Sequence, residues 1–176
     1  DENGQFHSSR TFRDHFKRGE ELIDFDEACI EIRTQHDRFV EIAGREPDYF
    51  EAHAVMSKNL NRAISAVAQE LGLKEQKASF DPTAVVHCGD TDLRMVMHSM
   101  EPGYEPKDSI MQTVREMADG ETVVFVCHPG YLDRFILENS SLTTDRTKEV
   151  DALIDPELRA WLEAQDDLRL IDYRDL

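Results

Sequence analysis

The chain has 176 residues, 40% of them hydrophobic, which is enough for one ordinary packed domain. Its 20 basic and 37 acidic residues give a net charge of −17, which argues against nucleic acid or an anionic membrane surface as a partner, because both attract basic faces. The sequence contains no apolar run near the ~20 residues of a membrane span and does not begin with a signal-peptide pattern. We therefore expect a single domain over residues 1–176.

The three cysteines predict free thiols in a reducing compartment. Cys29, Cys88 and Cys127 are an odd number without the spacing of a disulfide framework. His87 precedes Cys88 and His128 follows Cys127, but adjacent strand residues point to opposite faces, so each pair offers one ligand on a given side. Two ligands do not close a zinc site. We expect buried thiols and a cytoplasmic protein.

Apolar periodicity and capping residues predict four elements in the first half of the chain. These are a short helix near Phe12–Phe16, a helix from Asp24 or Asp26 to about Ala43, a strand over Tyr49–Val55 and a helix over Asn59–Leu71. Gly44 and Gly72 end the two longer helices, because glycine accepts the left-handed conformation that follows a helix.

The second half of the chain predicts strands that alternate with helices. In order they are strands near Ala84–His87 and Leu93–His98, a helix from Asp108 to about Ala118, a strand over Thr122–Cys127, helices near Asp145–Leu153 and Pro156–Ala164, and a strand over Leu168–Tyr173. The segment Thr122–Cys127 is strongly apolar, which is typical of a parallel strand buried on both faces. This alternation predicts an α/β fold, whose chemistry sits at the carboxyl ends of the strands.

Glu51 and His53 form the first candidate site. On a strand they share one face, because side chains alternate with a period of two. A carboxylate and an imidazole in this arrangement can bind one metal ion, or the carboxylate can orient the imidazole. The simpler alternative is a polar strand end with a hydrogen-bonded histidine.

His128 is the second candidate, placed where a buried strand must turn. Pro129 cannot continue a strand ladder and Gly130 tolerates unusual dihedral angles. A histidine held at such a strand end suits general acid–base catalysis near neutral pH, although a structural histidine that bonds turn carbonyls fits as well. Asp133, five residues later, would orient the imidazole or cap the following segment. We count His128 and Asp133 as the catalytic candidates.

Arg146 ends a polar run that begins at Ser140, just before a predicted helix. Capping is the simple interpretation of the run, and Arg146 can also hold a substrate or pair with groups at the strand ends. The sequence has no G-x-S-x-G, P-loop or G-x-G-x-x-G motif, so a serine hydrolase and a nucleotide-binding protein have no support.

Several segments carry a family resemblance when taken together. They are Val126–Asp133 (V-C-H-P-G-Y-L-D), Ser140–Val150, Pro156–Leu158 and Ile171–Leu176, with Gly44–His53 and Asp1–Phe6 upstream. In order and spacing these blocks resemble the YdjC-like carbohydrate deacetylases, a family that includes the chitooligosaccharide deacetylase. Gly44–His53 is similar to the segment where the family has P-T-H-L-D-S-H-x-H-V-H, and Asp1–Phe6 is similar to its D-x-x-G-x-F turn.

The resemblance implies a (β/α)-barrel-like fold with parallel strands and metal-dependent removal of an N-acetyl group from an amino sugar or oligosaccharide. It implies a divalent cation, Mg²⁺ or Zn²⁺, with His53 at the position of a metal-ligand histidine and Glu51 in place of an aspartate. His128 aligns with the histidine of C-H-P-G, which would protonate the leaving amine. We take Tyr131 and Arg146 as the substrate-binding candidates.

The sequence also departs from the family pattern. Val55 and Ser57 stand where the family has further histidines, and no Asp-Asp-Phe-Gly or His-Leu-Thr motif is present. We therefore expect the C-terminal portion of the barrel without its N-terminal strands, with the other metal ligands outside this chain. We also expect this chain to be inactive as a deacetylase by itself if nothing supplies the missing motifs. Bare apolar surface would then favour a homodimer.

Two alternatives stay open beside the deacetylase. One is a non-catalytic sugar-binding or interaction module on the same scaffold. The other is a metal-dependent hydrolase of a different amide or ester, because a fold does not determine a function.

Overall fold

The computed structural model describes residues 3–76, 85–99 and 101–176 of the chain. The described residues divide into two compact units, which we treat separately. Unit 1 contains residues 3–76, Val86–Asp92 and Asp172–Leu176, and unit 2 contains Val85 and Leu93–Ile171 apart from residue 100. The single domain over residues 1–176 stays a prediction.

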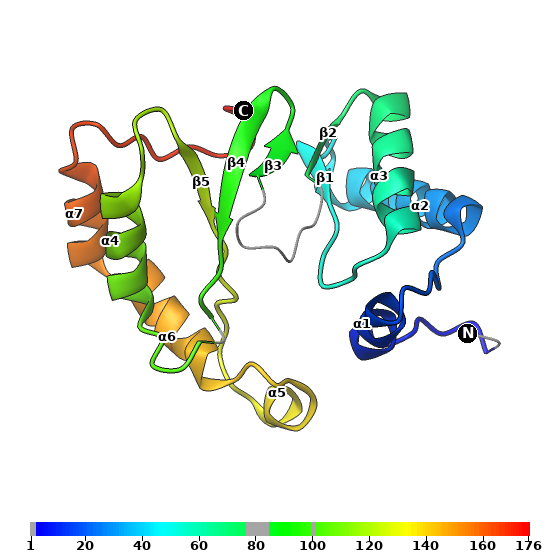
Figure 1. Cartoon of the computed structure of the whole chain (residues 1–176), viewed down its shortest axis with the longest axis horizontal. Helices are drawn as coiled ribbons and strands as arrows, with labels where there is room; N and C mark the ends of the chain where they lie inside the picture. Colours follow the sequence, from blue (N-terminus) through cyan, green and yellow to red (C-terminus); the bar gives the residue numbers. More distant parts are fainter. Residues whose placement is uncertain (1–2, 77–84, 100) are drawn as a thin grey trace. The chain divides into compact units, whose positions relative to one another are not determined.

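Unit 1 contains three helices, two short strands and most of a third strand. They are α1 (Ser9–Lys17), α2 (Phe25–Ala43), β1 (Tyr49–Glu51), α3 (Lys58–Leu71), β2 (Lys74–Gln76) and β3 (Val85–Cys88) (Figure 1). Asp24, one of the two predicted caps, accepts hydrogen bonds from the first backbone amides of α2. Gly44 and Gly72 end α2 and α3 with φ angles of 66° and 69°, as the sequence predicts.

The core of unit 1 lies between α2 and α3. Ala28 and Cys29 of α2 meet Ala63 and Val67 of α3, and all four side chains are buried. Small residues at this contact let the two helices approach closely, while larger apolar side chains close the edges of the cluster. Phe50 of β1 also packs against this cluster and so connects the strand to the helix pair.

The strands of unit 1 combine both directions of pairing. β1 and β2 are parallel, with Tyr49 opposite Lys74, and α3 is the helix that connects them. β2 and β3 are antiparallel at Gln76 and Cys88, where the sequence predicts parallel strands. Within unit 1 the hydrogen-bonded order β1-β2-β3 follows the chain. The predicted α/β class is confirmed.

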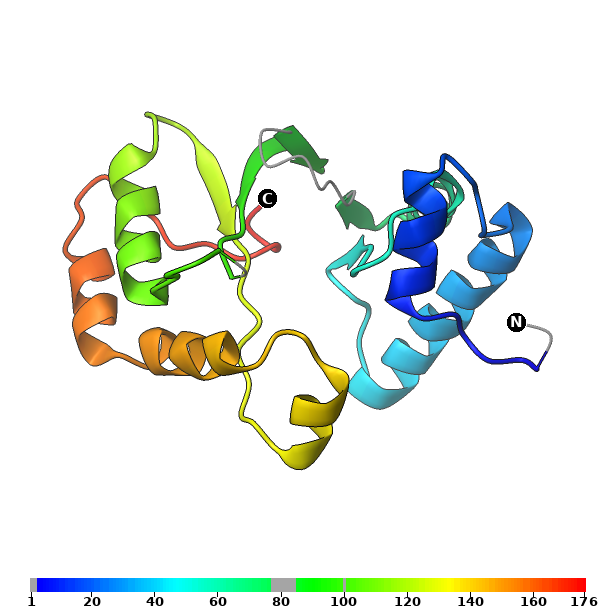
Figure 2. The same cartoon turned by 60° about the horizontal axis from the view of Figure 1, so that its bottom comes forward.

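Unit 2 contains most of β4 (Thr91–Val96) and the elements that follow it. These are α4 (Pro106–Glu116), β5 (Thr122–Phe125), α5 (Arg134–Asn139), α6 (Thr144–Leu153) and α7 (Pro156–Glu163). β4 and β5 are parallel, with Leu93 opposite Thr122 and Val96 opposite Phe125. Figure 2 shows α4, α6 and α7 together on one side of this strand pair, and α6 packs against both other helices.

Some predicted elements differ from the structure in their bounds or burial. The strand from Tyr49 stops at Glu51 instead of continuing to Val55, and Ala54 beyond it adopts a positive φ of 55°. The residues of β5 are half-buried rather than fully buried. α4 begins at Pro106, since proline suits the first turn of a helix, and Asp108 follows inside that turn. Ala84, at the start of another predicted strand, lies outside the described residues.

The predicted strand over Leu168–Tyr173 is wrong, since the structure has loop and turn there. Asp172 accepts a hydrogen bond from the backbone amide of Arg174, and such a local side-chain bond competes with a strand ladder. The Tyr173 ring stacks on Tyr49 with 3.7 Å between centroids. Two short elements, β2 and α5, were not predicted. In the described part of the chain, no helix is long and apolar enough to cross a membrane.

Candidate functional site

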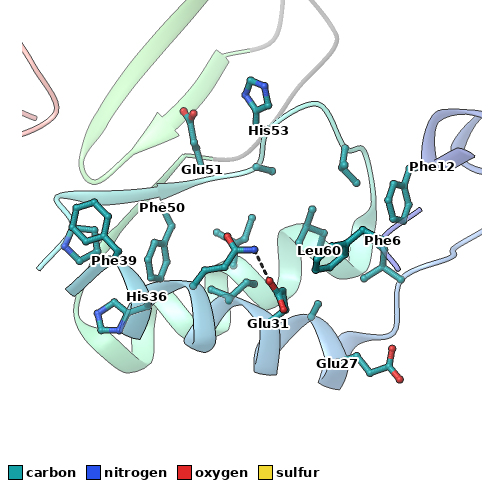
Figure 3. Close-up of a pocket in the computed structure, with 18 of the residues that line it drawn as sticks. Phe6, Phe12, Glu27, Glu31, His36, Phe39, Phe50, Glu51, His53 and Leu60 are labelled. Atoms are coloured by element: carbon teal, nitrogen blue, oxygen red, sulfur yellow. Dashed lines mark hydrogen bonds between the residues drawn. The ribbon is translucent and has the colours of Figure 1, made fainter. Parts of the chain in front are cut away.

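Glu51 and His53 border a cavity of about 940 Å³ in unit 1. Figure 3 shows both side chains pointing away from α2, on the opposite side of β1 from the apolar side chains that form the floor of the cavity. Aromatic and aliphatic side chains line much of that floor: Phe6, Phe12, Phe39, Phe50 and Leu60. Glu51 and His53 are both exposed at the rim of this cavity, and their joint role as metal ligands stays a prediction.

Glu51 and His53, the two predicted metal ligands at this rim, do not complete a metal site. Glu51 is the last residue of β1, and His53 lies beyond the strand end. Within the residues that the structure describes, no group of three or more histidine, cysteine or acidic side chains is placed to hold a metal ion. A protein-bound metal usually takes three or more protein ligands, and Glu51 with His53 offers two.

His128 is held in unit 2 just beyond the end of β5. The Val126 amide donates to the Val96 carbonyl at 2.7 Å, which extends the β4–β5 pairing by one residue. The His128 amide then donates to Oε2 of Glu149 at 2.6 Å. The Nδ1 atom of the imidazole lies 3.1 Å from Oγ of Ser99, a fully buried residue that follows β4. Both the peptide and the ring of His128 are thus fixed.

Glu149 and Tyr104 form the buried side of this cluster. Glu149 has no exposed surface, and its Oε1 accepts a hydrogen bond of 3.1 Å from the Tyr104 hydroxyl. Burial, together with the negative charge of Glu149, raises the pKa of Tyr104, so this hydroxyl keeps its proton at neutral pH. The same two causes raise the pKa of the half-buried Cys127 thiol to about 11. The three cysteines are free, as predicted; Cys29 and Cys88 are buried, but the prediction of a buried thiol is wrong for Cys127, which is half-buried.

Arg146 is the predicted site residue that the structure brings to His128. Its Nε donates to the Leu142 carbonyl at 2.9 Å, and its Nη1 reaches the His128 carbonyl at 3.4 Å. The Gly130 amide in turn donates to the Arg146 carbonyl at 3.3 Å. Arg146 therefore stabilises the loop that carries His128.

Asp133 and Tyr131 occupy different surroundings. The Asp133 side chain accepts a hydrogen bond from the Ile136 amide at 2.8 Å and caps α5, which is one of the two roles predicted for it. Tyr131 is 79% exposed. The catalytic role of Asp133 and the substrate-binding role of Tyr131 stay predictions.

Sequence reasoning missed Ser99, Tyr104 and Glu149 as members of the cluster. Glu149 carries a signal in retrospect, because it lies three residues after Arg146 on a predicted helix, and side chains at this spacing share one face. It is also a carboxylate next to Ala152 on the buried side of α6. Ser99 and Tyr104 belong to the turns after β4 and follow no recognisable pattern.

The fold and the His128 cluster define an α/β protein with a candidate acid–base site at the carboxyl end of parallel strands. The sequence model of the family described as YdjC-like protein matches residues 1–164. The chain belongs to this family, as its sequence motifs predict.

Similarity to two named proteins supports membership in the same family. The chain is 27% identical over 154 residues to "Carbohydrate deacetylase 2" of Listeria innocua serovar 6a, covering 86% of this chain and 60% of the relative. It is 28% identical over 167 residues to "Chitooligosaccharide deacetylase" of Klebsiella pneumoniae, covering 89% of this chain and 64% of the relative. The chain thus spans less than two thirds of the length of these two relatives.

A solved structure from Enterococcus faecalis V583 shares the fold. That protein, named as a candidate cellobiose-phosphate cleavage protein, superposes with a TM-score of 0.74 at 20% identity over 99% of this chain and 67% of its own. At this identity the similarity concerns the fold alone. It confirms the predicted α/β fold class, with this chain matching part of the larger barrel-like fold.

Proposed function

We propose that this chain takes part in the hydrolysis of an N-acetyl group from an amino sugar or oligosaccharide, the reaction of a carbohydrate deacetylase. Its membership in the YdjC-like family and its similarity to proteins named for deacetylation support this substrate class. The observation that carries the proposal is His128, whose peptide and ring are both fixed at the end of a parallel strand.

In this proposal His128 is the general acid. Hydrolysis of an acetamide adds water to the acetyl carbon and breaks the carbon–nitrogen bond, and the departing nitrogen must gain a proton to leave as an amine. Because Nδ1 is engaged by Ser99, Nε2 is the ring nitrogen that would deliver this proton. The products are acetate and the free amino sugar.

Three other residues enter the proposal with supporting roles. Tyr131 offers an exposed ring that can lie against the apolar face of a sugar. Arg146 of α6 would contact the substrate through the part of its guanidinium that does not face backbone carbonyls. Asp133 would assist His128 only if it left its position as the cap of α5.

The divalent cation is a separate proposal, because the described residues do not complete a site for it. Glu51 and His53 would supply two ligands to Mg²⁺ or Zn²⁺, and a stable site needs at least one more. We derive no step of the reaction through this ion.

A sugar-binding module without catalysis is the second candidate. Among the described residues no three potential metal ligands are placed to hold one ion, and this favours the module over a metal-dependent hydrolase of a different amide or ester. A cytoplasmic location and a homodimer stay predictions.

Acetate release and sugar binding separate the two candidates. The chain is extended upstream with a segment that carries the Asp-Asp-Phe-Gly and His-Leu-Thr motifs that it lacks, and it is incubated with N-acetylglucosamine oligomers and either Mg²⁺ or Zn²⁺. Acetate is measured by an enzyme-coupled assay, and binding is followed by saturation-transfer NMR. We expect acetate release that falls about 10²–10⁴-fold in His128→Ala. His87→Ala, an exposed histidine of unit 1, is the matched control and keeps the wild-type rate. Binding without acetate release would support the module and contradict the deacetylase.

A further inference from the structure

Helix α6 holds the His128 peptide at both of its polar atoms. Glu149 accepts a hydrogen bond from the His128 amide at 2.6 Å, and Arg146 reaches the His128 carbonyl at 3.4 Å. The two residues are three apart and therefore share one face of the helix. A single helix face thus determines where the peptide of the candidate acid lies.

The chemistry of this contact calls for a carboxylate. Each oxygen of Glu149 accepts from one donor, the His128 amide at Oε2 and the Tyr104 hydroxyl at Oε1. A glutamine in the same place would satisfy one donor with its carbonyl and would turn its own N–H groups toward the other. Because a charge without exposed surface is costly to bury, a carboxylate here needs both hydrogen bonds.

The imidazole is held from the opposite direction by a second buried group. Ser99 has no exposed surface and meets Nδ1 of His128 at 3.1 Å. In the structure this contact forms with the peptide of His128 held by Glu149. The direction in which Nε2 points therefore depends on both contacts.

We propose that Glu149 is a positioning residue for His128, which sets the direction and the tautomer of the imidazole by fixing the peptide that carries it. The effect on catalysis rests on the proposed function, in which His128 protonates the leaving amine. The effect on the ring itself does not depend on that function.

The principal experiment replaces Glu149 with Gln and follows the His128 ring by long-range ¹H–¹⁵N NMR. We expect one dominant tautomer in the wild-type chain, and a mixed or exchange-broadened ring signal in Glu149→Gln, because the Ser99 contact is no longer held. For acetate release from N-acetylglucosamine oligomers, measured with the chain extended upstream, we expect kcat to fall about 10–100-fold with KM within about twofold of the unsubstituted form, since small displacements of a reacting group cost rate rather than binding.

Two further variants separate positioning from a purely structural role. Asp151→Asn removes an exposed carboxylate from the same helix and is expected to leave the ring signal and kcat unchanged. Glu149→Asp keeps the charge but shortens the side chain, and we expect it to restore part of the single-tautomer signal. If Glu149→Ala does not fold, as judged by circular dichroism, the Gln and Asp variants still decide the question.

Different outcomes would overturn the two proposals. A wild-type ring spectrum in a folded Glu149→Gln or Glu149→Ala variant contradicts the positioning role, whatever the activity. Absence of acetate release from the chain extended upstream contradicts the proposed function alone, and the ring spectrum then still decides the role of Glu149.

Discussion

The two candidate regions hold their functional groups in opposite ways. In unit 1, Glu51 and His53 are exposed at the rim of a cavity, where β1 ends and a loop begins. In unit 2, His128 is fixed through its amide and its ring by two fully buried residues, Glu149 and Ser99. A group that transfers a proton needs a defined direction, whereas donors to a cation gain their geometry from the ion and its other ligands. The comparison predicts that substitutions in unit 2 disturb structure and chemistry together.

The largest expected difference is in stability. Glu149→Ala leaves both the His128 amide and the Tyr104 hydroxyl without their acceptor, at about 1–3 kcal/mol for each buried donor. Glu51→Ala removes an exposed carboxylate and is expected to change the free energy of unfolding by no more than about 0.5 kcal/mol. Urea denaturation measures both values. Equal losses in the two variants would show that the contrast between the regions is wrong.

The next prediction concerns the reactivity of Cys127. A thiol pKa of about 11, against an ordinary value of 9.0, leaves about 100-fold less thiolate at pH 7. We expect slow alkylation by iodoacetamide, followed by mass spectrometry, and faster alkylation in Glu149→Gln because a nearby negative charge is lost. Cys127→Ser identifies the labelled peptide. A Cys127 that reacts as fast in the wild-type chain as an unfolded thiol would contradict the buried, negatively charged surroundings.

A smaller effect is expected at the rim of unit 1. If Glu51 and His53 contribute two ligands to a cation, His53→Ala should weaken Mg²⁺ or Zn²⁺ binding about tenfold, equivalent to about 1.4 kcal/mol, in isothermal titration calorimetry. His128→Ala, in unit 2, should bind the ion as the wild-type chain does. The cation proposal fails if neither ion binds the wild-type chain or if His53→Ala binds as tightly.

The smallest effect is a pH dependence of stability in unit 1. Hydrogen bonds to Glu46 and then to Asp37 raise the pKa of His36 above its ordinary value of 6.5. A raised pKa means that the protonated ring stabilises the folded state fully below about pH 6.5 and loses this contribution as the pH rises through the folded-state pKa. Urea denaturation should therefore show His36→Gln destabilising the chain more at pH 5.5 than at pH 8.5. A difference that is constant or grows with pH contradicts this assignment.

Elements with strong local signals were predictable. The cap of α2 at Asp24, the stops at Gly44 and Gly72 and the helices over Thr144–Leu153 and Pro156–Glu163 follow from residues that are neighbours in the chain. The strand predicted over Leu168–Tyr173 failed because Asp172 bonds the backbone locally and its neighbour Tyr173 stacks on Tyr49. The alternation of apolar and polar residues in the sequence indicates neither the hydrogen bond of Asp172 nor the stacking of Tyr173.

The sequence by itself determined the α/β class, the family and His128 as a candidate acid, because each depends on local patterns or on ordered motifs. Only the tertiary structure decided what holds that histidine. Glu149 lies 21 residues from His128 in the chain and Ser99 lies 29 residues from it, so no periodicity relates them. Their pairing follows from parallel β4 and β5, which bring the ends of two strands together, and from the packing of α6 that buries Glu149. A buried polar group must find its partners in three dimensions, and those partners are fixed by packing.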